Sequence, residues 1–155
     1  VLYKQNRIGE NNTTFTIRKF RSMLYNAEKD SGPVWAADED PRITRVGAWL
    51  RRFRLDEIPQ LINVIKGEMS IIGPRPERPF FIDKLMQEFP FYYRRHKVRP
   101  GITGWSQIKQ PYDRDIDDVR KKLKYDFYYI ENLSFSLYIK ILASTFWVIR
   151  SCKGR

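Results

Sequence analysis

The sequence predicts an α+β fold that is mainly helical, with one small β-hairpin at the N-terminus. β-prone runs occur near the start of the chain, whereas apolar residues recur at helical spacing through most of the remainder. The chain has 155 residues, of which 42% are hydrophobic, and this is enough for one domain with its own core. We therefore expect residues 1–155 to form a single domain.

The hairpin is predicted from two β-prone runs, residues 1–5 and 15–20, on either side of a turn sequence at residues 9–12. The segment 26–41 follows, with glycine, proline and a run of acidic residues but no sustained hydrophobic period. Such a composition indicates an exposed loop.

Two short helices are predicted next. Thr44 is placed to cap the first, and the second begins near Asp56 and Glu57 and stops at Gly67. Pro59 is acceptable only because it falls in the first turn. The apolar residues at helical spacing are Val46, Trp49, Leu50 and Phe53 in the first helix and Ile58, Leu61, Ile62 and Ile65 in the second. Both acidic residues are thus expected at a helix N-terminus.

Turns and helices alternate in the second half of the chain. The Gly-Pro-Arg-Pro sequence at residues 73–76 predicts a rigid extended turn, because proline restricts itself and the residue before it. Apolar spacing then predicts a helix over residues 81–89, and residues 99–105 are expected to form a loop. A longer helix is predicted after Asp113 and Asp115, with an apolar stripe that runs to Ile130.

A final helix is predicted over residues 135–149, with Ser134 placed to cap it. This segment is apolar almost all round, contains Trp147 and is followed by cations. An interfacial helix lying on a bilayer has this character, but so does a helix buried in a core. The sequence leaves both possibilities open.

Composition limits the function further. The excess of 29 Lys and Arg over 18 Asp and Glu gives a net charge of +11, which indicates an anionic partner: nucleic acid, acidic lipid or a phosphorylated small molecule. The single cysteine and single histidine exclude an internal disulfide and make a metal cluster of these residues improbable. No apolar run reaches the length of a transmembrane helix. Because Val1 is not an initiator methionine, we expect the chain to be a fragment that a membrane anchor can precede.

Basic residues suited to phosphate binding occur at several places. Prolines flank Arg75 and reduce the entropy that it would lose on gripping a phosphate. The other candidates are Lys19 and Arg21, Arg51 within an arginine cluster, and Arg99. His96 lies between two basic residues and is expected at the surface or in a loop, without a catalytic role.

The adjacent carboxylates Asp56 and Glu57 have two interpretations. Acidic residues commonly stabilise a helix N-terminus, which would be a purely structural role. Alternatively, nearby cations would keep Asp56 ionised, and its carboxylate could attack phosphorus to form an acyl phosphate. Glu57 could then hold a divalent cation. For Asp126 the sequence allows either a role near a nucleotide or an ion pair on a helix surface.

A resemblance to a known family covers essentially the whole chain. The segments that carry it are Gln5–Gly9, Lys19–Met23, Leu55–Leu61, Gly67–Ser70, Gly73–Pro76, Arg99–Gln107 and Tyr125–Ile130. Taken in this order, they resemble the bacterial sugar transferase family, the monotopic phosphoglycosyl transferases. The re-entrant hydrophobic helix that normally precedes the first motif in that family does not occur in this sequence.

The resemblance implies transfer of a sugar 1-phosphate from a UDP-sugar to a polyprenyl phosphate at the cytoplasmic face of the bacterial inner membrane, within exopolysaccharide assembly. It implies that Asp56 is the nucleophile, with Mg²⁺ required and Glu57 beside it. It also implies phosphate binding by Arg51 and Arg75, with Lys19 and Arg21 as further substrate-binding candidates. Gln107 and the loop of Arg99 are expected near the nucleotide.

Two non-enzymatic functions compete with this prediction. A basic chain with four tryptophans could bind nucleic acid, but no nucleic-acid-binding motif is present and acidic clusters interrupt the basic residues. A basic module that sits on anionic membrane lipid is the other alternative. The substitution Asp56→Asn separates them, since only an enzyme would lose turnover.

Overall fold

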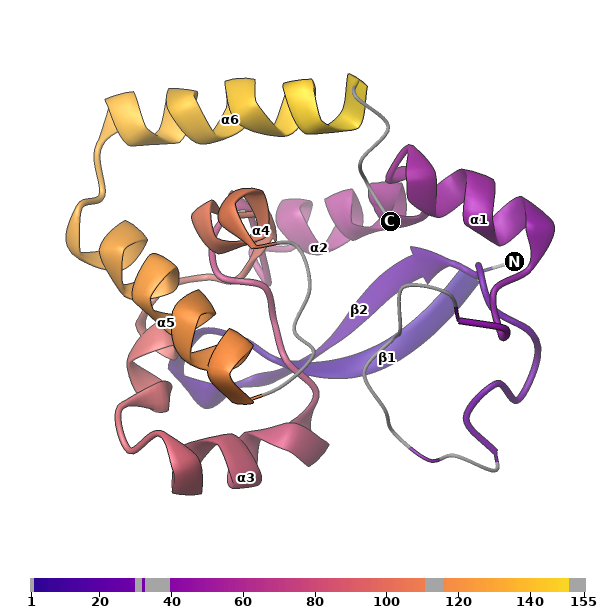
Figure 1. Ribbon diagram of the computed structural model, residues 1–155, viewed down its shortest axis with the longest axis horizontal. Helices are drawn as coiled ribbons and strands as arrows, with labels where there is room; N and C mark the ends of the chain where they lie inside the picture. Colours follow the sequence, from indigo (N-terminus) through magenta and orange to yellow (C-terminus); the bar gives the residue numbers. More distant parts are fainter. Residues whose placement is uncertain (1, 30–31, 33–39, 111–115, 151–155) are drawn as a thin grey trace.

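A computed structural model describes residues 2–29, 32, 40–110 and 116–150 (Figure 1). Its elements, with η for 3-10 helices, are β1 (Leu2–Ile8), η1 (Glu10–Asn12), β2 (Thr14–Phe20), α1 (Arg45–Arg52), η2 (Leu55–Gln60), α2 (Leu61–Ile65), β3 (Ser70–Ile72), α3 (Pro79–Glu88), η3 (Tyr92–Lys97), β4 (Gly101–Thr103), α4 (Trp105–Lys109), α5 (Ile116–Glu131) and α6 (Phe135–Arg150). The predicted α+β class is confirmed. Most of the expected loop 26–41, together with Asp113 and Asp115, lies outside the described residues.

The predicted hairpin is present. β1 and β2 pair antiparallel from Leu2 opposite Phe20 to Ile8 opposite Thr14. The turn between them uses Asn11 and Asn12 with positive φ, which asparagine tolerates better than most residues. Phe15 and Ile17 of β2 pack on Met69 in a small core. The hairpin is thereby fixed against the segment that follows α2.

A second sheet was not predicted. β3 and β4 pair in parallel, with Ser70 opposite Gly101 and Ile72 opposite Thr103. The expectation of a loop throughout 99–105 is therefore wrong for residues 101–103, and it is also wrong for Trp105, which begins α4. A Cβ on Gly101 would lie 2.0 Å from the backbone nitrogen of Gly73. The pairing therefore depends on glycine at the point where these two segments of the backbone touch. Each of these strands has only three residues, and 28 residues separate them in the sequence. Strands this short show no alternating pattern from which they could be predicted.

Two further cores hold the helices together. One lies between α3, η3 and α5, where Ile82, Leu85, Tyr92, Val119 and Leu123 are buried. The other joins α6 to β3 and α5 through Ile141, Leu137, Ile72 and Tyr129. In the view of Figure 1, α1, α2, α4 and α6 lie above the hairpin and α3 lies below it.

The caps predicted for the helices are confirmed. The Thr44 side chain accepts a hydrogen bond from the Gly47 N–H at 2.9 Å, and Ser134 Oγ accepts one from the Leu137 N–H at 3.3 Å. Gly67, after α2, has a φ of 75°. Residues 73–76 form the expected extended turn between β3 and α3.

The apolar stripes of α1, η2 and α2 face solvent instead of a core. The exposed members are Val46, Trp49, Ile58, Leu61, Ile62 and Ile65. α6 has both characters that the sequence left open, because Leu137 and Ile141 are buried while Phe135, Phe146 and Trp147 are exposed. Within the described residues, no helix combines the length and apolarity needed to cross a membrane.

Candidate active site

Asp56 and Glu57 lie in the first turn of a helix, as the sequence predicts, but this is the 3-10 helix η2, and the α-helix α2 begins only at Leu61. Arg54, just before this turn, has φ 54° and ψ 21°, and this left-handed residue separates η2 from α1. Glu57 N–H donates to the Arg54 carbonyl at 3.2 Å. The two acidic residues are only 7% and 5% exposed. Acidic residues that only cap a helix are usually exposed, so the burial of these two indicates a functional site.

Three cations from different segments hold Glu57. Its Oε1 accepts hydrogen bonds from Lys19 Nζ on β2 at 2.9 Å and from Arg75 Nη2 at 2.8 Å. Arg54 Nη1 lies 3.7 Å from Oε2. Burial alone would raise the pKa of Glu57, but Arg75, Lys19 and Arg54 together hold it well below the usual range. Glu57 is therefore an ionised, fixed carboxylate.

Asp56 has the opposite environment. Burial and the neighbouring charge of Glu57 raise its pKa above the ordinary value, and Lys19, Arg51 and Arg75 offset this only in part. From the sequence, nearby cations are expected to outweigh burial in setting the pKa of Asp56. They do not, because Lys19 and Arg75 donate their hydrogen bonds to Glu57. Among the described residues, the Asp56 carboxylate has no hydrogen-bond or ion-pair partner.

The structure brings three of the predicted phosphate-binding cations to the dyad. Lys19 and Arg75 contact Glu57 directly, and Arg51 is close enough to lower the pKa of Asp56. Burial lowers the pKa of Lys19 to about 8. Arg51 Nε donates to Ser22 Oγ at 2.9 Å, which fixes the direction of its guanidinium.

The other predicted substrate-binding residues lie elsewhere. Arg21 lies over the rings of Tyr3 and Tyr25, at 5.6 and 5.4 Å from their centroids. Arg99 is exposed and pairs with Glu10 at 3.4 Å. Gln107 is buried in α4, and its amide oxygen and nitrogen find no hydrogen-bond partner in the part of the chain that the structure describes. Their roles toward a nucleotide stay predictions.

Sequence reasoning missed two supporting residues. Arg54 was noted only as part of an arginine cluster, yet it pairs with Glu57. Ser22 was not singled out at all, although it orients Arg51. The sequence feature that points to Ser22 is Gly47, a glycine inside the predicted helix. A Cβ at that position would lie 1.9 Å from the Ser22 carbonyl oxygen. Glycine lets α1 approach Ser22 closely enough for Arg51, one turn later, to reach it.

The donor set around the dyad fits a magnesium ion shared with a substrate. Glu57 Oε1 accepts hydrogen bonds from Lys19 and Arg75, but within the described residues the buried Oε2 has no hydrogen-bond partner. This atom and the unpaired Asp56 carboxylate are two oxygen donors, and Mg²⁺ commonly uses one or two carboxylates together with phosphate oxygens and water. No cluster of three or more His, Cys, Asp or Glu residues suited to a metal occurs in the described part of the chain.

Comparisons with known proteins show the family of the chain. The model of the bacterial sugar transferase family matches residues 1–151. The UDP-N-acetylgalactosamine-undecaprenyl-phosphate N-acetylgalactosaminephosphotransferase of Aeromonas hydrophila is 52% identical over 142 residues, which cover 92% of this chain and 33% of that protein.

Two further relatives are similar over nearly the whole chain. The UDP-glucose:undecaprenyl-phosphate glucose-1-phosphate transferase of Escherichia coli (strain K12) is 41% identical over 94% of this chain and 32% of its own length. The exopolysaccharide production protein PSS of Rhizobium leguminosarum bv. phaseoli is 39% identical over 94% of this chain and 75% of its own. The chain thus spans about a third of the first two relatives.

Proposed function

Because the chain belongs to the bacterial sugar transferase family, we propose that it transfers a sugar 1-phosphate from a UDP-sugar to a polyprenyl phosphate. The names of the Aeromonas and Escherichia relatives specify different sugars but the same lipid acceptor, undecaprenyl phosphate. This agreement supports the reaction class. The name of the Rhizobium relative supports a place in exopolysaccharide or related glycan assembly.

The observation that carries the chemistry is the contrast within the dyad: Asp56 is buried and has no ion-pair partner among the described residues, while Lys19 and Arg75 bind Glu57. In the proposed first step, an Asp56 carboxylate oxygen attacks the phosphorus that bears the sugar. The bond from this phosphorus to the bridging oxygen breaks, and UMP leaves with that oxygen. The product on the enzyme is an aspartyl phosphosugar, an acyl phosphate.

In the proposed second step, an oxygen of the polyprenyl phosphate attacks the same phosphorus. The acyl phosphate bond breaks, the Asp56 carboxylate is regenerated, and the lipid carries a diphosphate-linked sugar. Lys19, Arg51 and Arg75 supply positive charge beside both carboxylates, which offsets repulsion between the nucleophile and the phosphate oxygens. Mg²⁺ held by Asp56 and Glu57 Oε2 would add to this charge when bound.

We place the reaction at the cytoplasmic face of the bacterial inner membrane. The exposed apolar and aromatic residues of α1, α2 and α6 support contact with lipid, since helices that lie on a bilayer present such side chains to it. A lipid-bound acceptor would then be within reach of the dyad at the start of η2.

The test is to incubate the chain, reconstituted in lipid with undecaprenyl phosphate, with a panel of UDP-sugars and to measure UMP release. Mass spectrometry of protein quenched during turnover should show one phosphosugar adduct on Asp56. Asp56→Asn should abolish both signals while membrane binding persists. Turnover that survives this substitution, or an adduct on another residue, would contradict the mechanism, and unchanged behaviour would favour a binding module.

A further inference from the structure

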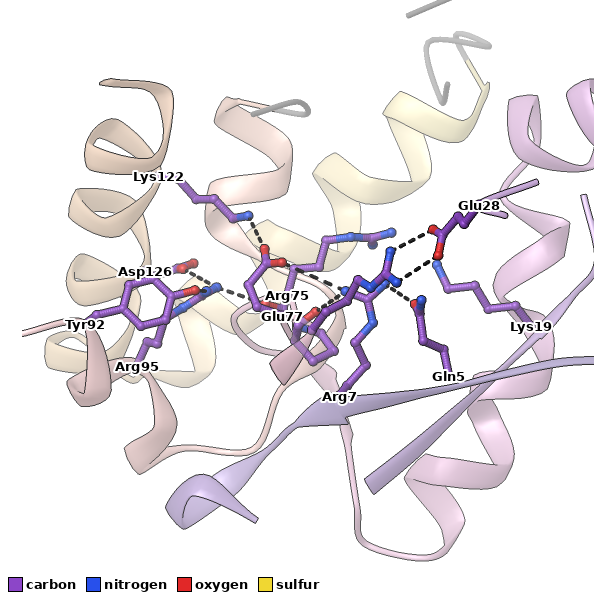
Figure 2. Close-up of polar contacts among 12 residues, drawn as sticks. Gln5, Arg7, Lys19, Glu28, Arg75, Glu77, Tyr92, Arg95, Lys122 and Asp126 are labelled. Carbon is purple, nitrogen blue, oxygen red and sulfur yellow. Dashed lines mark hydrogen bonds and ion pairs between the residues drawn. The ribbon is translucent and has the colours of Figure 1, made fainter. Parts of the chain in front are cut away.

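Hydrogen bonds hold the backbone of the turn that carries Arg75, and Figure 2 shows two of the residues that donate them, Arg7 and Arg95. Four successive carbonyl oxygens, those of residues 74–77, each accept a hydrogen bond. The donors are the Gly101 N–H to Pro74 at 3.0 Å, Arg95 Nη2 to Arg75 at 2.9 Å, Arg7 Nη1 to Pro76 at 3.1 Å and the Ile8 N–H to Glu77 at 3.0 Å. Two of these donors are guanidinium groups, those of Arg95 and Arg7.

Arg75 is the position where the backbone of this turn retains rotational freedom. Pro74 and Pro76 fix their own φ angles, so the remaining backbone rotation lies mainly at the residue between them. The Arg75 side chain is 35% exposed, and its terminal nitrogen reaches Glu57 at 2.8 Å. Its direction therefore depends on how the Arg75 peptide is oriented, and the Arg95 bond fixes that peptide.

A buried charge in turn holds Arg95. Arg95 and Asp126 are 3% and 1% exposed and form an ion pair at 2.8 Å between Nη2 and Oδ2. Arg95 Nη1 also donates to the hydroxyl of Tyr92. The sequence analysis allowed Asp126 an ion pair on the helix surface, and the structure shows that the pair lies in the interior between η3 and α5. A buried ion pair often adds little net stability compared with apolar residues of similar size, so a role in fixing the geometry of Arg95 is a hypothesis that its position supports.

The neighbouring residue of the turn is anchored in the same way. Glu77 is buried, and its Oε1 accepts a hydrogen bond from Lys122 Nζ on α5 at 3.0 Å. Arg7 Nη1 lies 3.9 Å from Glu77 Oε2. Lys122 and Asp126 are one helical turn apart on α5. The helix therefore holds residues 74–77 at two points, directly through Lys122 and indirectly through the pair of Asp126 with Arg95.

We propose that Arg95 and Asp126 are positioning residues for the transfer reaction: Asp126 orients Arg95, and Arg95 holds the Arg75 carbonyl so that the Arg75 guanidinium reaches the dyad. The inference rests on the proposed function, in which Arg75 stabilises the phosphate. It assigns a role to a helix, α5, that contributes no residue to the dyad itself.

The test is a double-mutant cycle of Arg95→Lys and Arg75→Ala. Lysine keeps the charge opposite Asp126, but its single nitrogen cannot serve Tyr92, Asp126 and the Arg75 carbonyl together. Arg95→Lys should slow UMP release by about tenfold or more, with the kcat and KM pattern of Arg75→Ala in weaker form. In the Arg75→Ala background it should cause no further loss, because its effect passes through Arg75.

Glu131→Gln is the matched control. Glu131 pairs with Arg94 at 2.9 Å across the same two elements, but at the surface. This variant should keep wild-type rates. Asp126→Asn, which leaves Arg95 in place without its counter-charge, is the second route should Arg95→Lys fail to fold.

A crystal structure of the folded variant gives a readout that does not depend on activity. The contact between Arg75 Nη2 and Glu57 Oε1 should be lost or lengthened. Full activity of Arg95→Lys, losses that add to those of Arg75→Ala, or an unchanged Arg75–Glu57 contact would each overturn the inference. A wild-type protein that releases no UMP would instead refute the proposed function, while the variant structure would still decide the positioning role.

Discussion

Replacing Glu57 with glutamine should destabilise the fold and do so in a pH-dependent way. The substitution keeps the size of the side chain but removes the carboxylate that Lys19, Arg54 and Arg75 share, so that Asp56 is the one acidic group of the dyad left near them. Removing one partner of a buried ion pair typically costs about 3–5 kcal/mol. Because these cations are 17–35% exposed and water screens them in part, we expect a loss of about 2–3 kcal/mol in the free energy of unfolding at pH 7.

The sign of the pH dependence follows from the lowered pKa of Glu57. Between its folded pKa and the ordinary value of 4.5, the unfolded chain binds the proton that the folded chain does not. The stabilisation is therefore complete above about pH 4.5 and is lost as the pH falls through the folded pKa. The difference between wild type and Glu57→Gln that comes from this carboxylate should shrink as the pH falls below 4.5.

Denaturant unfolding followed by circular dichroism at pH 7, 5.5 and 4 measures these differences. Glu131→Gln, which removes an exposed ion pair, is the control and should cost at most about 1 kcal/mol. The reasoning would be refuted if Glu57→Gln cost no more than this control, or if its penalty did not shrink in acid.

Two further predictions test the surroundings of the site. Burial, and secondarily Arg95, lower the pKa of His96 to about 4, so wild-type stability should fall as the pH drops from 6.5 to about 4.5, and His96→Gln should flatten this slope in unfolding titrations. A slope that is the same in the variant would place His96 in solvent. Gly47→Ala should push α1 away from Ser22, lower the thermal midpoint and reduce the rate of UMP release through Arg51, whereas Ala48→Gly on the exposed side of α1 should affect stability alone. Wild-type kinetics in Gly47→Ala would show that α1 need not touch Ser22.

Local signals in the sequence predicted much of the fold. The hairpin, the caps at Thr44 and Ser134 and the position of the dyad follow from residues within a few places of one another, and all are present. The parallel pairing of β3 with β4 depends on contacts between distant segments, which no local pattern records. The burial of His96 is another such case: its neighbours in sequence are charged, but its Nδ1 lies 2.5 Å from Asn12 Oδ1 of the hairpin turn.

In the candidate site, too, the sequence predicts some features, and others depend on contacts between distant segments. Sequence alone identified Asp56, Glu57, Lys19, Arg51 and Arg75 as charges suited to phosphate chemistry, and the structure places them together. It could not show that the cations favour Glu57 over Asp56, because that depends on which carboxylate Lys19 and Arg75 reach in three dimensions.

This unequal sharing of charge is what assigns different roles to two adjacent acids. Environments that push the pKa values of neighbouring groups apart are a common way to separate catalytic roles. Glu57, with a pKa held low and Oε1 bonded to two cations, is a weak base with little freedom to attack. Asp56 has a raised pKa and no hydrogen-bonded oxygen among the described contacts, so it is the more basic and the freer carboxylate.

The negative charge of Glu57 itself contributes to the raised pKa of Asp56. Glu57→Gln should therefore weaken Asp56 as a nucleophile as well as destabilise the fold, and it should also release Lys19 and Arg75 to pair with Asp56. We infer that the two carboxylates act as a unit: Glu57 holds the cations close enough to receive a phosphate, yet keeps them from occupying the oxygen that must attack it.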